Sequence, residues 1–168
     1  MKKIVTFLMI LCMIPVLCAC SGKPNMEDLL SYQRPGMKYS LRIADREVFL
    51  ADLKITEKEM HLIFTDEKRN GISYQLRENG VVSLFYEDTE IPLAESELVK
   101  CQRWFSAFSV SANENIWKIK KETLGGISLY VCKDGLFTLY IDAVSKLPLK
   151  IEAGNMTIDV LSCEAEEK

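Results

Sequence analysis

The side chain best suited to acid–base chemistry is His61, the single histidine of the chain. It lies in the segment Glu59-Met60-His61-Leu62-Ile63, where alternation places it opposite Met60 and Leu62. A histidine acts as a general base only when a nucleophile is oriented beside it. The sequence has no Gly-x-Ser-x-Gly motif or comparable signature. We therefore expect His61 to face solvent or a rim, without a catalytic role.

Acidic pairs could in principle supply the acid and base of a glycosidase. Glu57/Glu59 and Asp88/Glu90 are such pairs, but both lie near expected strand ends, where charged side chains belong to a solvated surface. Gly125-Gly126 is a lone loop pair and not a phosphate-binding loop. The sequence therefore predicts no catalytic residue and no cofactor.

Three cysteines lie beyond the N-terminal region, namely Cys101, Cys132 and Cys163. Their odd number allows at most one intramolecular disulfide, and without a Cys-x-x-Cys motif or a nearby histidine we expect no metal site. Cys132 and Cys163 fall on the first and last strands of an expected four-strand meander, about 14 Å apart. A disulfide needs Cα atoms within roughly 7 Å. We expect buried free thiols; for any bridge, Cys101 remains the partner of either Cys132 or Cys163.

The first twenty residues, MKKIVTFLMILCMIPVLCAC, indicate a different chemistry. Lys2 and Lys3 form a positive start, and an apolar run follows over residues 4–17. This run is shorter than the roughly 20 residues that span a bilayer, and no stop-transfer flank follows it. We predict a signal peptide over residues 1–19.

The end of this run, Leu17-Cys18-Ala19-Cys20, resembles the bacterial lipobox, in which a thiol receives diacylglycerol before cleavage in front of it. The resemblance implies that Cys20 is the lipid acceptor and mature N-terminus, preceded by the small residue Ala19. The alternatives are cleavage before Cys18 and an ordinary cleaved signal peptide. Each buried acyl CH₂ contributes about 0.8 kcal/mol. We expect a lipoprotein anchored at the extracytoplasmic face of the cell membrane.

Length and charge bound the rest of the chain. Removing the leader leaves about 149 residues, enough for one domain with its own core. We expect a tether over 20–25, a single domain over 26–163 and a charged tail over 164–168. Without Lys2 and Lys3, 19 basic residues remain against 24 acidic ones, a net charge of −5. This balance argues against nucleic acid, and against a generally anionic membrane surface, as a partner.

Period-two alternation, which is typical of half-buried strands, dominates the domain. It predicts five strands between Met37 and Tyr86 and five more between Trp117 and Val160. Asn79-Gly80 and Asp134-Gly135 are hairpin signals between alternating runs. A short helix over 26–32 is expected before the first strand, with Asn25 as its N-cap.

Between the two strand series, the apolar period changes to three and four. This predicts an amphipathic helix over about 95–110, with Cys101 on its apolar side. The aromatic face needs a partner, which a sheet curving around the helix would supply. We expect core packing here, with a possible contact face for an apolar ligand or a partner segment made of Leu98, Trp104, Phe105 and Phe108.

The stretch Phe137–Glu152, FTLYIDAVSKLPLKIE, looks like the end of the lipoprotein-carrier (LolA/LolB-like) half-barrel family. In that family a strand ends in Asp, a turn follows, and a Leu-Pro-Leu strand returns. Here Asp142 can accept turn amides, and Pro148 suits a strand start. The order of elements is also similar to small uncharacterised lipoproteins of Firmicutes. The resemblance implies an α+β fold, in which a strongly curved, mostly antiparallel half-barrel of about 9–10 strands wraps around one central helix.

Two functions are compatible with this reading. We expect a non-catalytic binding module for an apolar ligand or a protein partner. The alternative is an envelope or cortex hydrolase, or its accessory subunit. It is suggested by a clostridial relative of similar build, a spore-germination lipoprotein that partners a cortex-lytic amidase.

Overall fold

The computed structural model describes residues 24–165, so the predicted signal peptide and Cys20 lie outside the described residues. The helices are α2 (Met26–Leu29) and α3 (Glu95–Ser106), with 3₁₀ turns η1 (Ser31–Gln33), η2 (Glu67–Arg69) and η3 (Glu114–Ile116). The strands are β1 (Met37–Ala44), β2 (Val48–Ile55), β3 (Glu59–Phe64), β4 (Ile72–Arg77), β5 (Val82–Tyr86), β6 (Thr89–Ile91), β7 (Lys118–Leu124), β8 (Ile127–Lys133), β9 (Thr138–Asp142), β10 (Pro148–Ala153) and β11 (Met156–Ala165).

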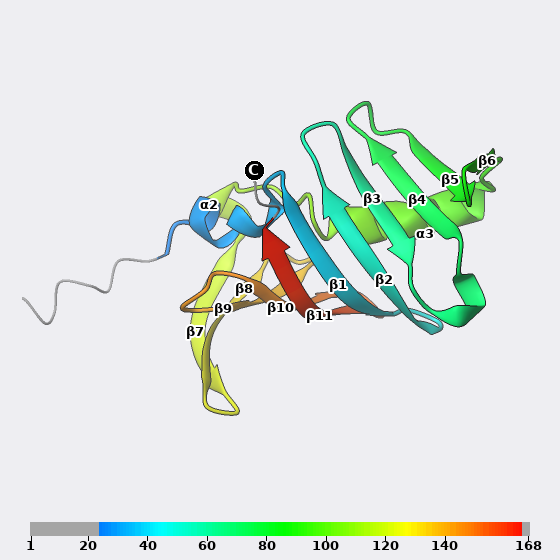
Figure 1. Cartoon of the computed structure of the whole chain (residues 1–168). Helices are drawn as coiled ribbons and strands as arrows, with labels where there is room; N and C mark the ends of the chain where they lie inside the picture. Colours follow the sequence, from blue (N-terminus) through cyan, green and yellow to red (C-terminus); the bar gives the residue numbers. More distant parts are fainter. Residues whose placement is uncertain (1–23, 166–168) are drawn as a thin grey trace, which may run out of the picture.

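The strands form one antiparallel sheet in the order β6-β5-β4-β3-β2-β1-β11-β10-β9-β8-β7. Two meanders are joined through the β1–β11 pair, where Ile43 lies beside Ile158. Within the described residues, β6 and β7 are the free edges, and α3 lies in the connection between them. Figure 1 shows α3 lying across one face of strands β2 to β5. The sheet has 11 strands, one more than the ten expected, because β6 is a fully exposed strand without alternation.

Alternation sets which side chains of the sheet enter the core. In β1, Met37, Tyr39, Leu41 and Ile43 are buried while the residues between them are exposed or half-buried. Its partner β11 adapts through a bulge, because Ser40 pairs with Ser162 but Leu41 pairs with Val160. The extra residue of the bulge is Leu161, and its side chain is exposed.

The helix α3 ends at Ser106, four residues before the expected end at 110. Two serine hydroxyls bind carbonyls of its last turns: Ser106 donates to the Gln102 carbonyl at 2.6 Å, and Ser109 donates to the Phe105 carbonyl at 3.2 Å. The backbone then tightens, with the Phe108 N–H donating to the Phe105 carbonyl at 2.9 Å. Phe108 therefore follows the helix instead of lying on it.

The segment after α3 packs against the N-terminal elements. The ring of Phe108 lies 5.3 Å from that of Tyr39 and 6.1 Å from that of Tyr32. The Tyr32 hydroxyl donates to the Ala107 carbonyl at 3.3 Å. The predicted cap of α2 is confirmed, because the Asn25 side chain accepts from the Glu27 N–H at 2.9 Å. These contacts hold the N-terminal elements α2 and η1 against the end of α3.

The three described cysteines are free thiols. Cys101 and Cys132 are fully buried, and burial raises their pKa values to about 12 and about 11. They are therefore neutral near pH 7 and poor nucleophiles. β9 and β10 separate the strands of Cys132 and Cys163, as the meander predicts. No helix of residues 24–165 is both long and apolar enough to cross a membrane.

The turn after β9 is organised by Asp142. Its Oδ1 accepts from the N–H of Val144 at 3.0 Å, and from the N–H and the hydroxyl of Ser145 at 2.7 and 2.9 Å. Pro148 begins β10 and pairs with Ile141. The structural roles expected for Asp142 and Pro148 are therefore confirmed.

Asp142→Ala should lower the free energy of unfolding by about 1 kcal/mol at neutral pH, because turn donors lose their acceptor. Hydrogen bonds from Ser145 hold the pKa of Asp142 below 3.8, its ordinary value. The stabilisation is thus complete above that value and is lost as pH falls through the lower folded-state pKa. Urea unfolding should show the difference from wild type shrinking in acid. Asp88→Ala, at an exposed turn, is the control; equal losses for the two variants at neutral pH would contradict this role.

Candidate functional site

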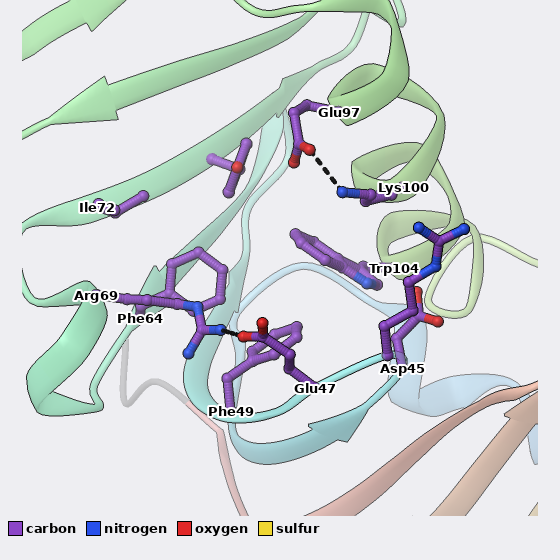
Figure 2. A pocket seen from close by; sticks show the side chains of 11 residues that line it. Asp45, Glu47, Phe49, Phe64, Arg69, Ile72, Glu97, Lys100 and Trp104 are labelled. Carbon is purple, nitrogen blue, oxygen red and sulfur yellow. Dashed lines mark hydrogen bonds and ion pairs between the residues drawn. The ribbon is translucent and has the colours of Figure 1, made fainter.

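A pocket of about 410 Å³ lies between α3 and strands β2 to β4. Small-molecule sites have volumes of roughly 300–1,000 Å³. Figure 2 shows Trp104 extending from α3 into this pocket, with charged side chains around its mouth. The residues that line it are Asp45, Arg46, Glu47, Phe49, Phe64, Arg69, Ile72, Tyr74, Glu97, Lys100 and Trp104.

Four aromatic rings form the floor of the pocket. Phe49, Phe64 and Tyr74 come from the inward faces of β2, β3 and β4, and Trp104 comes from α3. The Trp104 ring lies 5.1 Å from Phe49, 5.6 Å from Tyr74 and 6.0 Å from Phe64, each in an edge-to-face arrangement. Such pairs contribute about 0.5–1.5 kcal/mol beyond the burial of their area. The floor is therefore a rigid apolar surface.

The indole nitrogen of Trp104 has no hydrogen-bond partner, and no other buried side-chain nitrogen or oxygen of residues 24–165 is in this state. Leaving a buried donor unpaired costs about 1–3 kcal/mol. The other tryptophan differs, because the Trp117 N–H donates to the Ser111 carbonyl at 2.8 Å. This nitrogen is buried, so an acceptor brought by another molecule would reach it only after neighbouring side chains or the indole itself had moved.

Arg69 closes one side of the aromatic floor. Its guanidinium carbon lies 5.2 Å from the ring centre of Phe49 and 5.8 Å from that of Phe64. The same group pairs with the Glu47 carboxylate and, at 3.3 Å, with that of Asp66. Arginine suits this position because its planar group can stack on rings and pair with carboxylates at once.

Arg69→Lys should lower the free energy of unfolding by about 1 kcal/mol, because an ammonium cannot stack and pair in the same way. Arg42→Lys is the matched control: its pair with Asp159 at 2.8 Å is on an exposed strand face, where ion pairs contribute little. Urea denaturation of both variants tests the difference. A loss for Arg69→Lys no larger than that of the control would show that the stacking is unimportant.

Charges on the pocket wall balance. Arg46, Arg69 and Lys100 face Asp45, Glu47 and Glu97, three of each sign. Glu97 and Lys100 also pair with each other at 2.6 Å. A wall without net charge does not select strongly for an anion or a cation. The pocket therefore suits a group that is apolar or neutral overall.

Of the four residues predicted to form a ligand or partner face, Trp104 lines this pocket and the other three do not. Leu98 is half-buried against the core. Phe105 and Phe108 are each 1% exposed and belong to the core itself. No sequence motif marks Phe49, Phe64, Tyr74 or Arg69 as site residues. Alternation places the first three inward, but no sequence signal places Arg69 above them.

The residues considered for catalysis are not brought to the pocket. His61 lies on the outer face of β3 beside Gln75 of β4, and burial lowers its pKa, so it is neutral near pH 7. Glu59 accepts a hydrogen bond from Gln75. Asp88 and Glu90 are exposed around the start of β6. His61 and these carboxylates therefore form no joint site with Trp104.

Comparison with known proteins supports the fold and little else. No protein-family model matches the chain, and no curated protein matches its sequence. Among solved structures it is similar to the crystal structure of MucB, with a TM-score of 0.52 and 12% sequence identity. The fold is distantly lipoprotein-carrier-like.

The match has a limited extent. It covers 84% of this chain and 58% of the MucB chain, so this chain spans less than two thirds of its structural neighbour. At this identity the likeness shows a shared fold alone, and a fold can host unrelated functions. The pocket and the surface of this chain therefore carry the evidence for its function.

Proposed function

We propose that this protein is a lipoprotein of the cell envelope, held by a lipid on Cys20 at the extracytoplasmic face of the membrane. Its domain is a non-catalytic binding module. The pocket at Trp104 receives an apolar or aromatic group that carries a hydrogen-bond acceptor. That group belongs to a small ligand or to a segment of a protein partner.

The observation that carries this proposal is the unpaired N–H of Trp104 on the aromatic floor. A shift of Trp104 that brings this buried donor to the pocket would let a ligand carbonyl or ether oxygen pair with it, while an apolar ring would lie against Phe49 and Phe64. The balanced charges of the wall favour a neutral group. A binding role also suits the rim, where Glu97 and Lys100 neutralise each other.

We infer further that the sheet curves strongly around α3, as a half-barrel does. The same helix contacts both halves of the sheet. Trp104 packs on rings from β2 to β4, and Arg103 donates to the Ala153 carbonyl of β10 at 2.7 Å. This arrangement leaves the pocket along one side of the helix, from Glu97 to Trp104, facing the β1–β2 turn and strands β2 to β4.

Trp104→Phe should weaken the binding of the neutral probe 6-propionyl-2-(dimethylamino)naphthalene to the purified chain by about fivefold, the equivalent of one hydrogen bond. The probe supplies fused rings for the floor and a ketone oxygen as acceptor. Phenylalanine keeps most of the apolar contact but removes the donor. A fluorescence titration of the probe measures the affinity.

Trp117→Phe is the matched control, because both tryptophans are 7% exposed and the Trp117 donor is already paired. It should leave the affinity for the probe unchanged. Equal affinity in wild type and Trp104→Phe, or equal losses in the two variants, would rule out this pocket as the probe site. Binding of the probe by neither protein would exclude the small-ligand form of the proposal.

A further inference from the structure

The hairpin of β7 and β8 ends in a turn whose two glycines have open space around them among the described residues. Gly125 and Gly126 have φ values of 58° and 85°, as a two-residue type I′ turn requires. Leu124 and Ile127 pair across this turn and are 68% and 49% exposed. The adjoining strand β9 pairs with β8 only from Leu129 onward. The tip therefore extends beyond the neighbouring strand, and Figure 1 shows it projecting from the domain.

One more exposed apolar residue, Val144, lies in the turn beside the base of this tip. The Ala143 N–H donates to the Ser128 carbonyl at 2.9 Å, which holds the β9–β10 turn beside the base of the hairpin tip. Val144 in that turn is 87% exposed. Leu124, Ile127 and Val144 thus gather at one end of the sheet. Exposed apolar side chains that gather in this way mark contact surfaces.

The hairpin is basic although the chain is acidic. Residues 118–133 contain Lys118, Lys120, Lys121 and Lys133 against the single acid Glu122, a net charge of +3, whereas the whole chain has −3. The lysines of β7 are exposed. A positive strand behind an apolar tip is complementary to an anionic surface with an apolar interior.

We propose that the tip of the β7–β8 hairpin inserts into the interface of a bilayer that contains anionic phospholipid. Leu124, Ile127 and Val144 enter the boundary between headgroups and acyl chains, and Lys120 and Lys121 lie at the phosphates. This contact goes beyond the pocket and does not depend on a lipid at Cys20.

A bilayer fits this surface better than a protein partner does. Specific protein interfaces bury about 1,000 Å² or more, which three side chains at a narrow tip cannot supply. The two glycines present no side chain for specific recognition.

Hydrogen exchange of the full chain tests the proposal with a local readout. Vesicles of phosphatidylcholine with phosphatidylglycerol should slow exchange of the amides of residues 123–128 several-fold. Vesicles of phosphatidylcholine alone should slow it less. The turn over residues 134–137 is the internal control, because Leu136 there is 76% exposed at the opposite end of β8. Its exchange should not change.

Variants separate insertion from other causes. Leu124→Ser/Ile127→Ser should abolish the slowing, Lys120→Gln/Lys121→Gln should reduce it, and Leu136→Ser should leave it intact. Unchanged exchange in β9 to β11 shows that each variant is folded. The proposal is overturned if anionic vesicles do not slow amide exchange at the tip. It is also overturned if they still slow that exchange in the double serine variant. If amide exchange at the tip slows without vesicles as protein concentration rises, the tip contacts a second copy of the chain and the proposal is overturned.

Discussion

Phe108→Ala should lower the free energy of unfolding by about 3–5 kcal/mol, the usual cost of removing a fully buried phenylalanine. Phe108 is 1% exposed, and its ring contacts those of Tyr32 and Tyr39. The cavity left behind would have rigid walls, because Tyr32 is held by its bond to the Ala107 carbonyl. Partial collapse would break that bond, so relaxation cannot recover much of the loss.

Urea unfolding measures this effect, and Leu136→Ala is the control. Leu136 is 76% exposed, and its truncation should change the free energy of unfolding by no more than about 0.5 kcal/mol. The pair also tests the sequence-based prediction that Phe108 belongs to a ligand face. If Phe108→Ala were as stable as the control but bound the naphthalene probe less tightly, Phe108 would line a binding site and not the core.

The helix shows where sequence reasoning stops. Apolar spacing identifies the side of α3 that turns inward: Trp104 and Phe105 lie inward, as does Phe108 just after the helix. Spacing does not say which inward side chain meets a gap in the packing. The pocket lies at Trp104. Arg69, from a 3₁₀ turn far away in sequence, packs over the Phe49 ring at its side and does not fill it. No pattern in the neighbouring sequence predicts that Arg69 and Trp104 come together.

The sheet shows the same division. Alternation predicts ten of the strands and the main turns, since each strand has its own apolar face. The β1–β11 pair joins residues more than a hundred positions apart, as the ion pair of Arg42 with Asp159 shows, and local pattern cannot predict it. At Asn79-Gly80 only Gly80 has positive φ, because Arg77 bonds to Val81 across a three-residue loop. Turn residues predicted the hairpin but not its loop type.

The two proposed membrane contacts would reinforce each other. A lipid on Cys20 would confine the domain near the bilayer, so a second contact would form at a high effective concentration. Three apolar side chains and a few lysines would then suffice at the hairpin tip, although they would bind a membrane weakly alone. The tip would set the orientation of the domain, and the lipid would set its location.

Cys20→Ala should abolish incorporation of labelled palmitate into the protein. The thiol is the acceptor that the lipobox resemblance assigns, and alanine offers no nucleophilic sulfur. At about 0.8 kcal/mol for each buried CH₂, losing the acyl chains removes most of the free energy that holds the mature chain to the bilayer. Any leader-cleaved Cys20→Ala chain should therefore leave the washed membrane fraction, while wild type stays.

Cys18→Ala distinguishes the assigned acceptor from its neighbour. It should retain the label and the membrane location, because Cys18 lies before the predicted cleavage point. Loss of label in Cys18→Ala but not in Cys20→Ala would move the mature N-terminus to residue 18. Label in neither wild type nor variant, with the cleaved chain released, would make the leader an ordinary signal peptide. In that case the hairpin tip would meet the membrane without the help of a lipid, and its binding would be only that of a free domain.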